Sequence, residues 1–152
     1  MLTRLLIALG ALTITAAPAL AVPLSRQSQY LLDHHRASGG MYYIDSELCN
    51  SYNAYGLANM LTREVHICVK RHTNGANLGD TVRHEVWHVI QACNNGEALF
   101  NEPMQAMAEA DRSGWPWQAY QPDQWVIEAE AHNMARDLNE REIARFYNAY
   151  CN

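Results

Sequence analysis

Residues 80–93 carry the stretch that decides the fold, with the sequence DTVRHEVWHVIQAC. Asp80 is a favourable N-cap residue for a helix. Asn94-Asn95-Gly96 follows directly and is typical of a helix end. We therefore predict a helix from Thr81 to about Cys93, whereas the preceding residues 72–79 favour a turn.

This predicted helix contains His84-Glu85-Val86-Trp87-His88, an H-E-x-x-H pattern. Residues four apart lie on one helical face, so both imidazoles can reach a single metal ion. Glu85 lies about 100° around the helix, where it borders a metal-bound water and can accept its proton. Zinc lowers the pKa of such a water toward neutrality and polarises a scissile carbonyl. The pattern predicts zinc on His84 and His88, with Glu85 as general base.

A catalytic zinc site needs a third protein ligand and an open position. Gln91 and Asn94 stand where the extended pattern H-E-x-x-H-x-x-G-x-x-H requires glycine and histidine. The next carboxylates on a predicted helix are Glu128 and Glu130, which flank its apolar stripe on opposite sides. Either side chain can turn inward, but not both toward one ion. Helical periodicity alone leaves the third ligand open.

The other segments predict a mostly helical α+β domain with a small sheet. Residues 41–44 favour a short strand, and the alternation in residues 64–69 favours a second. Residues 49–59 favour a loop. Further helices are predicted at residues 27–36, 103–113 and 122–138 and from residue 139 onward, where Asn139 and Glu142 resemble a capping box.

The composition of the 152 residues, 49% hydrophobic and 18% charged, excludes a disordered or low-complexity polypeptide. The formal net charge is −5, and the few basic residues are scattered along the chain. Such a surface would repel phosphate backbones, so we expect no nucleic-acid partner.

Residues 1–21 have the three parts of a secretory signal peptide in order. The first four residues contain one basic residue, Arg4. A short apolar stretch follows, and the segment ends in an A-x-A site at Ala19-Leu20-Ala21. Cleavage leaves residues 22–152, with no internal repeat or linker, as one domain. We expect this domain to be secreted or periplasmic, monomeric, and without a stable membrane anchor.

The exported part contains four cysteines, an even number that predicts two disulfides. Sequence alone does not choose among the three possible pairings. We favour Cys49–Cys68 and Cys93–Cys151, because each pair would hold a neighbouring layer of the fold.

An H-E-x-x-H helix followed by a helix with E-x-E-A-x-x-x-A resembles the gluzincins, a family of zinc metallopeptidases, and especially their single-domain members. The resemblance implies that Glu128, the first glutamate of the run, completes the zinc site, with Glu130 as second choice. Many gluzincins carry Asp or Asn four residues after this ligand, where the present chain has His132. The family fold also implies a sheet edge beside the active-site helix that pairs with extended peptide, and residues 64–69 are the candidate strand.

These observations predict an exported enzyme that binds one Zn²⁺ and hydrolyses peptide bonds in peptide or protein substrates. His132, Tyr147 and Tyr150 are candidates for stabilising the transition state. The alternative is a catalytically inactive secreted domain that binds metal or a partner and retains the H-E-x-x-H helix. Glu85 argues against it, because metal binding alone needs no carboxylate there. A disulfide-held structural domain with an accidental motif is the third interpretation.

Overall fold

Three short strands form one mixed sheet in the order β1-β3-β2. Strand β1 (Met41–Ile44) runs parallel to β3 (Glu64–Ile67), and β2 (Gly56–Asn59) pairs antiparallel with the other side of β3. The computed structural model describes residues 22–100, 103–114 and 117–152. The predicted signal peptide, residues 1–21, lies outside this part of the chain.

Helices make up most of the described chain, so the predicted α+β class with a small sheet is confirmed for a single domain. They are α1 (Arg26–Ala37), α2 (Glu47–Ser51), α3 (Gly75–Cys93), α4 (Pro103–Arg112), α5 (Trp125–Asp137) and α6 (Glu140–Cys151), with 3₁₀ turns η1 (Val69–Arg71) and η2 (Trp117–Ala119).

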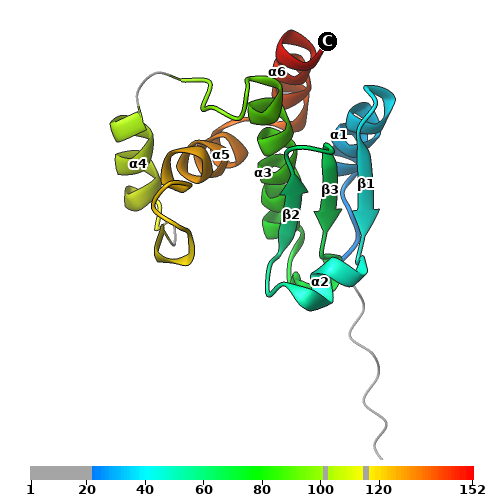
Figure 1. The fold of residues 1–152 in the computed structure, drawn as a ribbon. Helices are drawn as coiled ribbons and strands as arrows, with labels where there is room; N and C mark the ends of the chain where they lie inside the picture. Colours follow the sequence, from blue (N-terminus) through cyan, green and yellow to red (C-terminus); the bar gives the residue numbers. More distant parts are fainter. Residues whose placement is uncertain (1–21, 101–102, 115–116) are drawn as a thin grey trace, which may run out of the picture.

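Helix α3 lies at the centre of the fold and contacts the sheet, α1, α5 and α6 (Figure 1). One face of the sheet and the inner faces of α1, α3 and α6 share a single apolar core. Its fully buried members include Leu31, Val65, Ile67, Val82, Val86, Ile90 and Ile143. Because α3 touches every layer of this core, its side chains are held in place from several sides.

Strand β3 is central, so the prediction of an edge strand at residues 64–69 is wrong. Val65 and Ile67 face the core, and the intervening His66 is buried on the opposite face of the sheet. The His66 ring stacks on Tyr43 at 4.9 Å, and its Nδ1 lies 2.9 Å from Ser46 Oγ. The edge strand packed against α3 is β2, which lies within the predicted loop at residues 49–59.

Helix α3 also begins earlier than predicted, at Gly75 rather than Thr81. The Asn74 side chain accepts a hydrogen bond from the Asn77 backbone N–H and is the true N-cap. The extra turn buries Leu78, whereas Asp80 forms an ion pair with Arg83 within the helix. An additional apolar contact in the core therefore outweighs a favourable cap at Asp80.

Two other predicted helix starts have different outcomes. Helix α5 begins at Trp125 rather than Pro122, after a turn. The capping box at α6 is confirmed: the Asn139 side chain accepts from the Glu142 N–H, and the Glu142 carboxylate accepts from the Asn139 N–H at 2.8 Å.

Both predicted disulfides are present. Cys49–Cys68 joins α2 to the residue that follows β3, and Cys93–Cys151 joins the C-terminal ends of α3 and α6. These two disulfides include all four cysteines of the sequence. Each crosslink connects two elements that pack around the central core.

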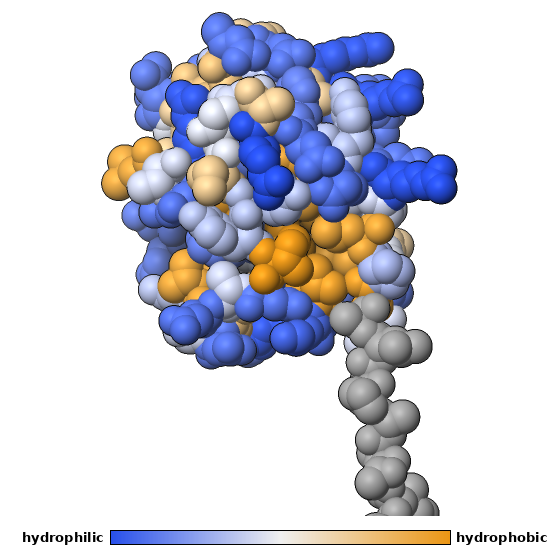
Figure 2. All heavy atoms as spheres, turned by 90° about the vertical axis from the view of Figure 1, so that its right-hand side faces the viewer, coloured by the Kyte–Doolittle hydropathy of each residue, from blue (hydrophilic) through white to orange (hydrophobic). Residues whose placement is uncertain are grey.

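Apolar side chains also reach the surface beside β1. Met41, Ile44 and Leu48 are among the exposed large hydrophobic residues. Figure 2 views this side of the molecule and shows an apolar patch next to the point where the described chain begins. Among residues 22–152 as far as they are described, the helices are too short or too polar to cross a bilayer.

Removing the Cys93–Cys151 crosslink by the double substitution Cys93→Ala/Cys151→Ala should lower the free energy of unfolding by about 4 kcal/mol. Cys49→Ala/Cys68→Ala should cost less, about 3 kcal/mol, because chain-entropy loss grows with loop length. The sequence separations are 58 and 19 residues. Urea denaturation of the three proteins under oxidising conditions measures both losses, and the reverse order would contradict the argument.

Candidate metal centre

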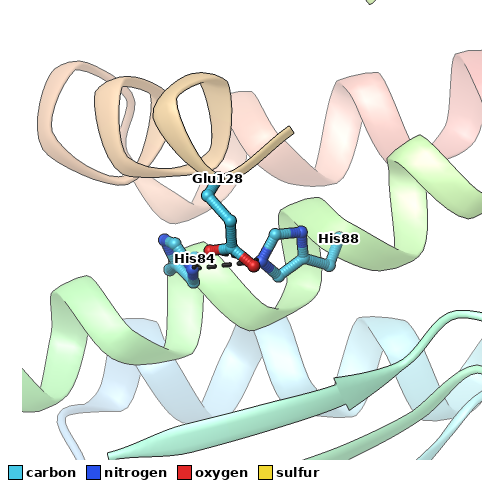
Figure 3. A group of neighbouring side chains, drawn as sticks. All are labelled: His84, His88 and Glu128. Carbon is cyan, nitrogen blue, oxygen red and sulfur yellow. Dashed lines mark hydrogen bonds and ion pairs between the residues drawn. The ribbon is translucent and has the colours of Figure 1, made fainter. Parts of the chain in front are cut away.

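His84, His88 and Glu128 converge at the contact between α3 and α5. The two histidines lie one turn apart on α3, and Glu128 reaches them from the first turn of α5 (Figure 3). Glu128 Oε2 lies 3.2 Å from His84 Nε2 and 3.4 Å from His88 Nε2. The two Nε2 atoms are 3.0 Å apart. Two nitrogens and one carboxylate oxygen therefore face a common point.

The donor set and its spacing fit a zinc ion. Zinc accepts imidazole nitrogen and carboxylate oxygen, with bonds of about 2.0–2.1 Å in tetrahedral geometry, which separates neighbouring ligand atoms by about 3.3 Å. The three separations, 3.0, 3.2 and 3.4 Å, lie around that value. Within the part of the chain that the structure describes, His84, His88 and Glu128 form the one group of three or more His, Cys, Asp or Glu side chains whose ligand atoms lie close enough together to hold a metal ion.

The electrostatics of the cluster also favour a cation. Burial disfavours the charged form of His88, but hydrogen bonding and attraction to Glu128 outweigh it and raise the His88 pKa to about 9. Burial likewise opposes ionisation of Glu128, but the two histidines lower its pKa to about 2. Without a metal, a proton on His88 thus supplies the positive charge beside Glu128.

Glu85 lies next to this cluster but is directed toward the sheet. Its side chain is buried, and burial raises its pKa, while the charges of His84 and His88 lower it and that of Glu128 raises it. A methyl carbon placed on Gly56 of β2 would lie only 2.7 Å from Glu85 Oε1 and from Thr81 Cγ2. The absence of a side chain at Gly56 therefore provides the space that Glu85 occupies.

Glu130, the second choice for the third ligand, lies elsewhere. Its buried carboxylate accepts hydrogen bonds from the side chains of Trp87 (2.9 Å) and Gln91 (3.0 Å). It also accepts from the backbone N–H groups of Leu99 (3.1 Å) and Phe100 (3.0 Å). Helical periodicity does not choose between the two glutamates. The structure brings Glu128 to the histidines and gives Glu130 four other partners.

The three candidates for transition-state stabilisation are placed differently. His132 lies one turn beyond Glu128 on α5, close enough to His84 for the charge of that residue to contribute to its lowered pKa, after the larger effect of burial. Its Nε2 is 2.8 Å from Ser113 Oγ.

The two tyrosines are not brought to the cluster. Tyr147 is fully buried among α1 and α6, with its hydroxyl 3.1 Å from His35 Nδ1. Tyr150 is exposed on the last turn of α6, beside the cysteine that binds Cys93 at the far end of α3. Of the three candidates, the structure therefore brings only His132 near the contact between α3 and α5, and α6 carries both tyrosines elsewhere.

Two residues of the site were missed by the sequence reasoning. Gln91 contacts His88 through a hydrogen bond of 2.7 Å between Gln91 Oε1 and His88 Nδ1. Its position three residues after His88 on one helix is a signal that could have identified it. Gly56 had no such signal, because its closeness to Glu85 depends on how β2 packs on α3.

The fold and the three-residue cluster define an α+β domain with a candidate metal centre between two helices. The model of one family, described as a domain of unknown function (DUF8637), matches residues 22–152, so the chain belongs to that family. Neither the curated proteins nor the solved structures yield a match.

Zinc binding should release close to one proton from His88 at pH 7. A ring with a pKa of about 9 is protonated at that pH, whereas a metal ligand must be neutral. The apparent affinity should accordingly rise about tenfold per pH unit between pH 7 and 8.5. Calorimetry in two buffers of different ionisation enthalpy measures the release, and a value near zero would contradict the assigned charge state.

Gly56→Ala should lower the free energy of unfolding by about 1–3 kcal/mol, because its methyl group overpacks Glu85 and Thr81. Gly75→Ala is the matched control, since a methyl group there meets only Val22 Cγ1 at 3.9 Å. We expect the control to stay within about 0.5 kcal/mol of the parent. Chemical denaturation of both variants tests this, and equal losses would argue against close packing at Gly56.

Proposed function

We propose that this protein is an exported zinc-dependent peptidase that hydrolyses peptide bonds. The observation that carries the proposal is the convergence of His84, His88 and Glu128 on one point, with the additional buried carboxylate of Glu85 beside them. A site that only stores metal has no need of this second carboxylate. The resemblance to gluzincins in the two motif helices supports the same assignment.

In the proposed site, His84, His88 and Glu128 hold one Zn²⁺. Zinc bound by three protein ligands activates water for nucleophilic attack and polarises a carbonyl group. Glu85 acts as general base through its carboxylate oxygen and then passes the accepted proton to the leaving amine. Burial raises the pKa of Glu85, which favours uptake of a proton by this carboxylate.

The proposed location rests on two features. Disulfides form and persist in oxidising compartments outside the cytoplasm, and the chain contains two. Residues 1–21 have the pattern of a secretory signal peptide. Both support a secreted or periplasmic protein in which residues 22–152 are the functional domain.

An extended peptide is the substrate class that the sheet favours. Strand β2 lies at the edge of the sheet and packs on α3, with Gly56 directly beside Glu85. Its outer side pairs with no other strand of the described chain. A peptide adding to this edge would bind through backbone hydrogen bonds and pass the general base. In this proposal β2 takes the role expected of residues 64–69.

The competing function is a secreted domain that binds metal or a partner and has no hydrolytic activity. The peptidase and the metal-binding form of the alternative both require zinc on His84, His88 and Glu128, but only the peptidase requires Glu85. Measuring hydrolytic activity and zinc content after substitution of Glu85 therefore distinguishes the peptidase from the metal-binding domain.

Glu85→Gln should retain near-stoichiometric zinc and lose hydrolysis of a fluorogenic peptide library by at least about 100-fold, since it removes the general base. Glu128→Gln should lose both zinc and hydrolysis. Glu64→Gln, on the outer face of β3, is the matched control and should keep both. Elemental analysis and fluorescence measure the two properties.

Wild-type protein that binds zinc but cleaves no member of the library would favour the metal-binding domain. Wild-type protein purified without bound zinc, and unable to take it up, would favour an accidental motif. Hydrolysis that survives Glu85→Gln would contradict the assigned role of Glu85.

A further inference from the structure

A continuous chain of buried hydrogen bonds leads from His88 away from the metal centre. His88 Nδ1 lies 2.7 Å from Gln91 Oε1, and Gln91 Nε2 lies 3.0 Å from Glu130 Oε1. Both Gln91 and Glu130 are at least 98% buried, since their exposed fractions are 0% and 2%. These groups belong to the interior of the contact between α3 and α5, so water does not compete for them.

The partners of Gln91 determine which way its amide group points. Its Nε2 atom donates to two groups that can only accept, the Ile127 carbonyl oxygen at 3.0 Å and the Glu130 carboxylate. Turning the amide over would place its oxygen against both acceptors. Gln91 Oε1 must therefore face His88, where it can only accept a hydrogen bond from Nδ1–H.

Glu130 is in turn held by groups that can only donate. Besides Gln91, it accepts from the indole N–H of Trp87 and from the backbone N–H groups of Leu99 and Phe100. All four of these partners donate, so the buried carboxyl group of Glu130 serves them only as an acceptor. Glu130 thus acts as a buried acceptor that sets the direction of the hydrogen bonds from Gln91 to His88.

We propose that Gln91 and Glu130 are positioning residues that hold the His88 ring with its proton on Nδ1 and with Nε2 directed at the metal. This inference rests on the proposed metal site. It assigns the support of His88 to Gln91 and Glu130, whereas His132 Nε2 is directed at Ser113. Partners behind a metal-binding histidine fix its tautomer and ring orientation in this way.

The same chain connects the metal centre to residues outside it. Leu99 and Phe100 bind Glu130 through their backbone N–H groups, and the Leu99 side chain also packs against the core. The Phe100 ring is stacked on Trp87 at 6.3 Å, and Trp87 lies between Glu85 and His88 in the motif. The polar chain therefore joins the motif helix, α5 and the segment that follows α3 in one rigid unit.

Gln91→Met keeps the approximate size of the side chain but removes the acceptor for His88 and the donor for Glu130. We expect zinc to bind about 10–100-fold more weakly, as measured by competition with a chelator. Val89→Ala is the matched control, because Val89 is buried on the same helix and its side chain has no polar role. This control should lose stability while keeping the zinc affinity of the parent.

A second readout follows the His88 Nδ1 proton by NMR in the metal-free protein. The parent and Val89→Ala should show a slowly exchanging Nδ1 proton, and Gln91→Met should lose it. Unchanged zinc affinity in Gln91→Met, or an Nδ1 proton equally protected in that variant, would overturn the proposal. If the parent itself binds no zinc, the proposed function fails. The positioning role then fails as well, even if NMR shows the hydrogen bond from His88 Nδ1.

If Gln91→Met does not yield folded protein, Glu130→Gln tests the same positioning role. It preserves the shape of residue 130 and leaves His88 and Gln91 in place, but it replaces one of the two acceptor oxygens with an NH₂ donor, which the donors around residue 130 cannot pair with. We expect zinc affinity to fall by about 3–10-fold. An affinity equal to that of the parent would contradict the role of Glu130.

Discussion

The Glu128 carboxylate lies between two imidazoles of α3, and this contact requires α5 to lie across α3 in one register. Other contacts keep the same register: Gln91 binds the Ile127 carbonyl, and the Arg83 guanidinium binds the Ala135 carbonyl at 2.6 Å. If α5 slid by one turn along α3, Glu128 would lose its contacts with the histidines, and Gln91 and Arg83 would lose their carbonyl partners. The candidate metal centre is thus a product of helix packing as much as of the motif itself.

Two glutamates separated by one residue serve opposite sides of α5. At about 100° per residue, Glu128 and Glu130 point roughly 160° apart around the helix. One therefore meets the histidines while the other enters the space behind α3 and binds Trp87. This division explains how the E-x-E pattern carries a half-buried carboxylate, Glu128, and a buried one, Glu130, without placing them against each other. One carboxylate balances the charge of a cation, and the other satisfies four N–H donors.

Local spacing was enough to predict the histidine pair and the capping box at Asn139, because both depend on residues within one helical turn. The choice of Glu128 over Glu130 was not available from periodicity, since it depends on Leu99 and Phe100 occupying the other side. Strand β2 was missed because Gly56-Leu57-Ala58-Asn59 has no β-branched residue and takes its conformation from pairing with β3. The start of α3 depended on burial of Leu78, which no local capping rule includes.

The Cys93–Cys151 crosslink has a consequence for the integrity of the polypeptide. It closes a loop that contains α4, α5 and nearly all of α6, so Glu128 and Glu130 both lie inside it. A single proteolytic nick anywhere in this loop leaves the two fragments covalently attached. Such a clipped molecule would migrate as one species on a non-reducing gel and separate into two only after the thiols are regenerated.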